Sequence, residues 1–463
     1  MTALNSILTG GIVERISHGM SRKAERGQQA QIKESNTRLP SSCSDLTASL
    51  SIAPNDDGLL VMGIYLMGGC YRYSSNTKQI YDCENVAKRT WVYEPFEDVF
   101  ITRRDMPIPR YRHISASING DSIWVLTGRD HDNNLIAQID VYTPETDQWI
   151  TLPAHLPPSL QISDGAFFTQ ESFLYIVGGY DNEHKATGNA VVIDTEATLQ
   201  LGELVFRDLK PMNTPRGDLS AIVFGRYAYV VGGFTHANAF CAPLPTTEIF
   251  DFLTNEWSYA ADLNIARGGV SLVIFNGRMF AFGGETTDSH EEDVSCEAID
   301  LSSTSYEINQ VTKMKPVNSV EVLTVNMKQY DQQVWNLAYS KFLPPDNPVF
   351  RSVAVAFPTK SVVYAFGGIY YQNENNEEVS FAMKTSDKVI QYVDDFKYGN
   401  QHGQSFGESS SSYTSYLIGG SVIFIVYILK SFFNWKVRRR FSALEYQSNA
   451  EFCIDGVSEI EVT

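Results

Sequence analysis

The sequence has few cysteines and lacks the short signatures of the common enzyme classes. Its six cysteines are scattered over 463 residues without a CxxC pair, so nothing indicates a zinc site built from thiolates. GxxxxGK(S/T), HExxH and GxGxxG patterns are absent as well, which argues against P-loop, zincin and dinucleotide chemistry. The letters GQSFG around Ser405 match a nucleophile elbow, but no hydrophobic strand precedes them. We therefore expect no catalytic residue, no metal and no cofactor.

Positive charge is also scarce. The chain has 36 Lys and Arg against 54 Asp and Glu, a formal net charge of −18. A nucleic-acid binder needs a basic face to neutralise phosphates, so this class is excluded. The acidic run DSHEED at 288–293 surrounds His290 with carboxylates, and we interpret it as a solvated loop because no second ligand cluster has a recognisable spacing.

A unit of about 50 residues recurs along the chain. The copy at 213–263 has two hydrophobic runs, the second ending in the double glycine of YAYVVGGF, and then a third run, EIFDF, followed by Trp257. Runs of this length bounded by turn residues predict four short strands per copy. The glycines that end the second run in the six copies are Gly68 and Gly69, Gly128, Gly178 and Gly179, Gly232 and Gly233, Gly283 and Gly284, and Gly367 and Gly368.

The internal spacing of the copies indicates that the repeat is genuine. An arginine precedes the first glycine by 16 positions in three copies, and Arg110 precedes Thr127, which replaces that glycine, by 17. The three pairs are Arg216 and Gly232, Arg267 and Gly283, and Arg351 and Gly367. A tryptophan follows the glycines in four copies, as Trp91, Trp149, Trp257 and Trp335. A four-stranded unit with this period predicts a propeller blade.

At these glycines and tryptophans the sequence resembles the kelch repeat. The resemblance covers residues 47–398 and implies an all-β fold, a six-bladed β-propeller. The chain departs from the pattern at 286–318, a long insertion in the fifth blade, and in the first blade, which has no arginine at its start. Residues 47–53 fit the inner strand of the first blade, which leaves the sixth blade to find its outer strand elsewhere.

Four segments flank the predicted propeller. Residues 1–46 show little hydrophobic periodicity and are expected to be disordered, and 399–414 is a Ser/Gly-rich linker. Residues 415–435 are mostly apolar, with Lys430 as their only charge, and long enough to cross a bilayer as one helix. The basic residues at the start of the tail, 436–463, favour a cytosolic C-terminus and an exoplasmic or lumenal propeller. The absence of an evident signal peptide supports the rival, a tail-anchored cytosolic scaffold.

The cysteines leave the compartment open. Cys70 and Cys83 flank the turn after the second strand of the first blade, where a cross-strand disulfide is sterically possible and two free buried thiols are equally so.

The leading hypothesis is a membrane-anchored module that binds a protein or glycan partner without catalysis of its own. Arg110, Arg216, Arg267 and Arg351 are predicted to ring one end of the channel and to favour an acidic ligand, unless each simply pairs with a carboxylate or carbonyl of a neighbouring blade. The enzymatic alternative is a carbohydrate-active oxidase similar to galactose oxidase, a copper enzyme on a seven-bladed kelch-type propeller. The six units and eight histidines of this chain do not match its ligand motif.

Overall fold

The computed structural model describes most of the predicted propeller. The described residues are 31–54, 58–74, 82–235, 243–275, 277–286, 315–323, 333–339, 350–360, 362–373 and 381–393. No helix among them is long and apolar enough to cross a membrane. The predicted linker (399–414), membrane helix (415–435) and tail (436–463) lie outside the described residues, as does most of the insertion at 286–318.

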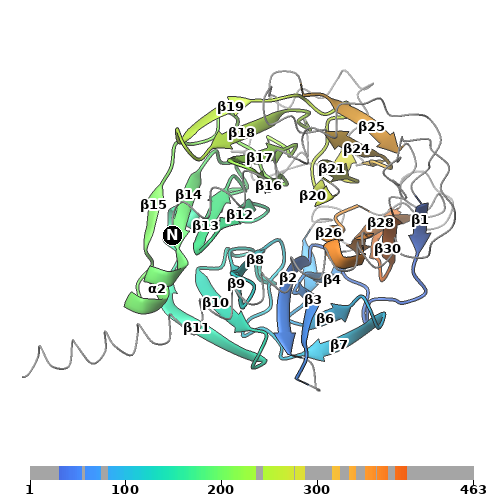
Figure 1. Ribbon diagram of the computed structural model, residues 1–463, viewed down its shortest axis with the longest axis horizontal. Helices are drawn as coiled ribbons and strands as arrows, with labels where there is room; N and C mark the ends of the chain where they lie inside the picture. Colours follow the sequence, from blue (N-terminus) through green and yellow to red (C-terminus); the bar gives the residue numbers. More distant parts are fainter. Residues whose placement is uncertain are drawn as a thin grey trace, which may run out of the picture. The chain divides into compact units, whose positions relative to one another are not determined.

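Six four-stranded antiparallel sheets form the blades of a propeller, confirming the fold predicted from the repeat (Figure 1). Blade 1 is β2 (Thr47–Pro54), β3 (Leu60–Met67), β6 (Thr90–Glu94) and β7 (Val99–Arg103); blade 2 is β8 (Ile114–Ile118), β9 (Ser122–Leu126), β10 (Gln138–Thr143) and β11 (Gln148–His155); blade 3 is β12 (Ala166–Gln170), β13 (Phe173–Val177), β14 (Ala190–Asp194) and β15 (Phe206–Asp208). Blade 4 is β16 (Ser220–Phe224), β17 (Tyr227–Val231), β18 (Thr247–Asp251) and β19 (Glu256–Tyr259); blade 5 is β20 (Ser271–Phe275), β21 (Arg278–Phe282), β24 (Val320–Leu323) and β25 (Trp335–Tyr339); blade 6 is β26 (Val353–Phe357), β27 (Val362–Phe366), β30 (Val389–Val393) and β1 (Gln31–Glu34).

The ring closes through β1, the outer strand of blade 6. Gln31–Glu34 pairs antiparallel with β30, although the two strands lie at opposite ends of the described sequence. Residues 31–46 were assigned to the disordered segment 1–46, so that boundary is wrong. The short polar strand QIKE pairs with the edge of β30, whose backbone groups would otherwise be left unpaired.

The inner strands of the blades line a central channel. Each contacts the inner strand of the next blade, in the order β2, β8, β12, β16, β20 and β26, and β26 contacts β2. A hydrophobic cluster fills each interface between neighbouring blades, including the closing one, where Ile64 and Leu66 of blade 1 pack with Phe366 of blade 6. Burial of these strands against their neighbours is the main source of stability in such a ring.

Among the residues that the structure describes, three blades carry an additional hairpin after their second strand. They are β4 (Cys70–Tyr73) with β5 (Cys83–Val86) in blade 1, β22 (Glu285–Thr286) with β23 (Lys315–Pro316) in blade 5, and β28 (Ile369–Asn373) with β29 (Phe381–Thr385) in blade 6. Blade 3 carries instead a short helix, α2 (Thr195–Leu201), between its third and fourth strands, and the Asp194 carboxylate caps it by accepting from the Ala197 amide.

The double glycines occupy the tight turn that ends each second strand. Gly232 and Gly233 have φ of 67° and 100°, which L-residues with a side chain rarely adopt. A Cβ on Gly232 would lie 2.4 Å from the Arg267 carbonyl oxygen of the next blade. These glycines therefore allow neighbouring blades to approach closely.

The tryptophans of the repeat occupy two different places. Trp149, Trp257 and Trp335 lie in the fourth strands of their blades, whereas Trp91 lies in β6, a third strand. Trp149 donates its indole N–H to the Arg104 carbonyl at 2.8 Å, which ties blade 2 to the strand that ends blade 1.

A charged cluster at one end of the channel

Three of the four repeat arginines are buried inside their own blades. Arg110, Arg216 and Arg267 have no exposed surface. Each donates to a carboxylate on the third strand of its blade. The pairs are Arg110 with Asp140 (2.6 Å), Arg216 with Glu248 (2.7 Å) and Arg267 with Glu321 (2.5 Å). Each also donates to backbone carbonyls, as when Arg216 Nη1 contacts the carbonyls of Gly232 and Thr246, both at 3.0 Å.

A blade has either both the buried repeat arginine and its third-strand carboxylate or neither of them. In blade 1 the strand register places Cys43 and Trp91 at the two positions, and in blade 3 it places Ile162 and Val191. The pair is therefore a structural unit that an apolar pair replaces in other blades. This corrects the prediction that these arginines ring the channel and favour an acidic ligand.

Arg351 is not equivalent to the other three arginines. It lies two residues before its inner strand, β26, whereas Arg216 lies four residues before β16. The shared spacing of 16 arises because the turn between β26 and β27 is two residues longer than the turn between β16 and β17. In the fold, Arg351 corresponds to Asp218.

Six residues with left-handed backbone, one from each blade, surround one end of the channel. They are Asp45, Arg112, Asp164, Asp218, Gly269 and Arg351, with φ between 48° and 58°. Four inter-blade hydrogen bonds connect them, because Arg112, Asp164, Asp218 and Gly269 each donate their amide to the carbonyl of the preceding member. Five of the six carry a charged side chain, although this conformation is uncommon outside glycine.

We use the term channel cluster for Asp45, Arg112, Asp164, Asp218, Glu285 and Arg351. Glu285 replaces the missing side chain of blade 5, where the left-handed residue is glycine. Arg351 contacts Glu285 at 3.0 Å and Asp45 at 3.6 Å. Arg112 contacts Asp164 at 3.5 Å. Each contact joins different blades, and all six side chains are at most 9% exposed.

The channel cluster has two more carboxylates than guanidiniums. Burial raises the pKa of Asp218 well above its usual value, and the nearby Asp164 adds to the effect. Burial also raises the pKa of Asp45 and Glu285, although Arg351 opposes both shifts. Tyr180 donates to Asp218 at 3.0 Å. This end of the channel is therefore rich in buried carboxylates that ionise with difficulty.

The excess of carboxylates also affects the pKa values of the guanidiniums. Burial opposes the charge of Arg351, but Glu285, Asp45, Asp218 and Asp164 outweigh it and raise the arginine pKa well above its usual value. Arg110, with one carboxylate, behaves in the opposite way, since burial lowers its pKa to about 10. A cation in the channel cluster is thus stabilised by several carboxylates at once.

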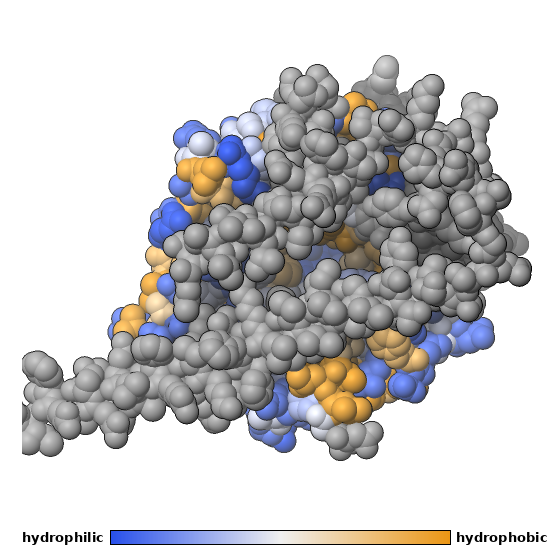
Figure 2. Space-filling model, in the orientation of Figure 1, coloured by the Kyte–Doolittle hydropathy of each residue, from blue (hydrophilic) through white to orange (hydrophobic). Residues whose placement is uncertain are grey.

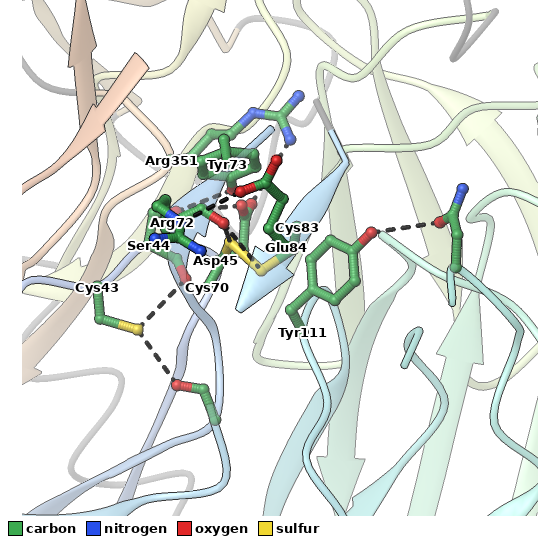
Figure 3. The surroundings of a disulfide bond; sticks show 12 residues. Cys43, Ser44, Asp45, Cys70, Arg72, Tyr73, Cys83, Glu84, Tyr111 and Arg351 are labelled. Carbon is green, nitrogen blue, oxygen red and sulfur yellow. Dashed lines mark hydrogen bonds and ion pairs between the residues drawn. A yellow bond between two sulfur atoms is a disulfide. The ribbon is translucent and has the colours of Figure 1, made fainter. Parts of the chain in front are cut away.

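The hairpins of blades 1, 5 and 6 rise from this end of the channel. Their first strands begin at Cys70, Glu285 and Ile369, each of which is bridged to the residue just before a left-handed position. Cys70 and Cys83 form a disulfide in the blade 1 hairpin, which resolves the alternative left open by the sequence. Figure 3 shows this disulfide beside Ser44 and Asp45.

Beyond the channel cluster lies a cavity of about 350 Å³ between the inner strands. Its lining residues include Ala48, Phe168, Ser220, Leu272 and Val353, from five different blades. In Figure 2, hydrophilic and hydrophobic residues of the described part of the chain are both visible near the middle of the face in view. The cavity therefore offers small and apolar side chains behind a charged entrance.

The carboxylates of the channel cluster are not arranged as metal ligands. Within the described ranges, the group of three or more potential ligands whose atoms lie within 4.8 Å of one another is Asp130, His131 and Asp132, in a mostly exposed loop. The DSHEED run at 288–293 lies outside the described residues.

Sequence reasoning missed five members of the channel cluster. A usable signal was present, because Arg112 and Asp218 each follow a buried repeat arginine by two residues. The sequence pattern drew attention to the arginine two positions earlier, so neither residue was assigned a role.

Comparison with known proteins agrees with the repeat pattern. The sequence profile of the KLHDC2/KLHL20/DRC7 Kelch-repeats domain matches residues 59–284, from the second strand of blade 1 to the double glycine of blade 5. The blades are kelch repeats.

Several curated kelch proteins are similar to this chain over part of their length. Beta-scruin of Limulus polyphemus is 26% identical over 234 residues, which cover 49% of this chain and 24% of that protein. Kelch-like protein terF of Aspergillus terreus is 24% identical over 208 residues, covering 43% and 44%. Kelch-like protein 41a of Danio rerio is 23% identical over 230 residues, covering 50% and 35%. The chain spans less than half the length of these relatives.

Proposed function

We propose that this kelch-repeat protein is a membrane-anchored interaction module that binds a protein or glycan partner through the channel end bearing the charged cluster. It acts by binding and has no catalysis of its own. The observation that carries the proposal is the channel cluster, in which charged side chains from all six blades converge beneath three hairpins. Loops displayed by a rigid scaffold are where binding residues concentrate.

Residues 415–435 are proposed as the single membrane anchor, because the stretch is apolar and long enough to span hydrocarbon. The propeller is proposed to be exoplasmic or lumenal. Basic residues after the anchor support this orientation, and so does the disulfide between Cys70 and Cys83, since such bonds persist in oxidising compartments.

Site-specific photocrosslinking in intact cells tests the binding end. A photoreactive amino acid at Glu183, exposed in the blade 3 loop at the charged end, should trap a defined partner. The same group at Leu253, 71% exposed in the turn between β18 and β19 at the opposite end, is the control. Equal crosslinking from both positions, or from Leu253 alone, would contradict the proposal.

Protease protection tests the anchor and its orientation. With a tag after Thr463, external protease on whole cells should remove the propeller and spare the tag, or the propeller should be shielded inside sealed vesicles. Digestion of the propeller from the cytosolic side would instead identify a tail-anchored scaffold. Release of the protein by alkaline carbonate would argue against any membrane span.

A further inference from the structure

The channel cluster has a charge pattern that restricts what can bind there. Resting on the proposed function, we propose that this end of the channel takes the cationic side chain of a lysine or arginine from a partner polypeptide. This is opposite in sign to the acidic ligand that the repeat arginines suggested. Three of those arginines are matched one to one by carboxylates inside their blades, and the fourth, Arg351, belongs to the channel cluster, so the charge available to a ligand comes from that cluster.

Two carboxylates of the cluster retain unused acceptors. Glu285 has no exposed surface and the Asp164 side chain is 5% exposed. Oε2 of Glu285 and Oδ2 of Asp164 accept no hydrogen bond from any residue that the structure describes. A buried carboxylate oxygen without a donor is costly, and a cationic donor would satisfy it.

Asp164 acts electrostatically on charged groups in most of the other blades. Its charge influences Asp45 of blade 1, Arg112 of blade 2, Asp218 of blade 4 and Arg351 of blade 6. Asp164 therefore lies near charged side chains of four other blades, one of which, Arg112, it contacts directly. A cation held in the channel cluster would be attracted by this carboxylate.

Groups further out do not cancel the carboxylate excess. Arg129 and Asp82 contribute one charge of each sign, and Arg129 donates to Ser163, Asn133 and Asp181. Burial lowers the pKa of His184 to about 4, so it is neutral near pH 7. The net charge of −18 on the whole chain also attracts a basic partner from a distance.

An organic cation fits the site better than a metal ion. The channel-cluster carboxylates come from separate blades and do not form one of the compact ligand groups found among the described residues. The cavity behind them is lined partly by alanine, leucine, valine and phenylalanine side chains. The aliphatic stem of lysine or arginine packs on such surfaces while its charged end meets acidic groups.

The test uses the full-length protein and a library of short capped peptides with randomised flanks. The central residue is arginine, lysine, glutamate or citrulline, which has the shape of arginine without its charge. Arginine and lysine peptides should be enriched, and the best arginine peptide should bind about tenfold or more tightly than its citrulline counterpart. No enrichment, or equal binding of arginine and citrulline peptides, would overturn the proposal.

Two variants locate the site. Asp164→Asn should weaken the best arginine peptide about tenfold or more, and Glu285→Gln provides a second reading if the first variant folds poorly. The matched control is Asp132→Asn, which removes the same charge from a side chain 67% exposed in the loop of blade 2 at the same end. An equal loss of affinity in the control would mean that the peptide responds only to the overall charge of the protein, and would overturn the assignment to Asp164.

Spermidine and Ca²⁺ distinguish a polypeptide side chain from a free cation. Competition by either at concentrations comparable to the peptide would overturn the assignment to a partner polypeptide. If photocrosslinking from Glu183 traps a partner whose binding is unaffected by Asp164→Asn, the proposed function stands and this inference fails. If no partner is trapped while arginine peptides bind through Asp164, this inference stands and the proposed function fails.

Discussion

The buried arginine pairs and the channel cluster use the same residue types and behave differently. Arg216 faces one carboxylate, Glu248, within its own blade, and backbone groups satisfy the rest of both side chains. Arg351 faces carboxylates from blades 1 and 5, and the cluster around it has more acid than base. The comparison indicates that matched charge inside a blade stabilises the fold, whereas the unmatched charge between blades is the part of the molecule that we propose binds a ligand.

The largest expected effect comes from breaking a matched pair. Arg216→Met would leave Glu248 charged and buried without its guanidinium, and removal of one partner of a buried pair costs about 3–5 kcal/mol. Urea unfolding should show this loss of stability. The double variant Arg216→Met, Glu248→Leu resembles the apolar pair of blade 3 and should recover part of it. Equal losses in the single and double variants would mean that the pair does not act as a unit.

Stability should respond to pH through Asp218. Because burial raises its pKa in the folded state, folded Asp218 holds its proton to a higher pH than unfolded Asp218 does. Stability of the natural protein should therefore fall relative to Asp218→Asn as pH rises between the two pKa values, by about 1.4 kcal/mol per pH unit. Unfolding curves of both proteins from pH 4 to pH 8 measure the difference. If Asp218→Asn instead became less stable relative to the natural protein as pH rises, the raised pKa would be contradicted.

A basic peptide in the channel cluster should release protons as it binds. Its charge favours the ionised forms of Asp218 and Glu285, whose pKa values are raised by burial. Affinity should increase with pH below these pKa values, by about tenfold per pH unit for each proton released. Calorimetry in buffers of different ionisation enthalpy counts the protons, and Asp218→Asn should release fewer. A binding enthalpy independent of the buffer would exclude this linkage.

The smallest effect is expected for an exposed ion pair. Arg89 contacts both oxygens of Asp105 at 3.1 Å, but its side chain is 52% exposed. Arg89→Ala should cost about 0.2–1 kcal/mol, since solvent and salt screen such pairs. The loss should shrink further at high salt in the same unfolding assay. A cost as large as that of Arg216→Met would show that burial is not what separates the two classes.

The sequence allowed the six blades to be predicted because the double glycines are local signals of a required turn. Ring closure was not predictable in the same way, since β1 is a four-residue polar strand whose partner lies far along the chain. Arg351 was predicted to be equivalent to the other three arginines because two differences of two residues cancel in its spacing to the glycine. The channel cluster is assembled by the ring itself, and apart from the charged residue two positions after Arg110 and after Arg216, its members share no sequence pattern.

One paired measurement tests the central distinction most directly: stability and arginine-peptide affinity of Arg216→Met and Asp164→Asn, side by side. The account predicts a crossed result, in which Arg216→Met loses the more stability but its folded fraction binds normally, and Asp164→Asn remains folded but loses binding about tenfold or more. If Arg216→Met loses affinity while Asp164→Asn retains it, the buried pairs carry the binding and the account is contradicted.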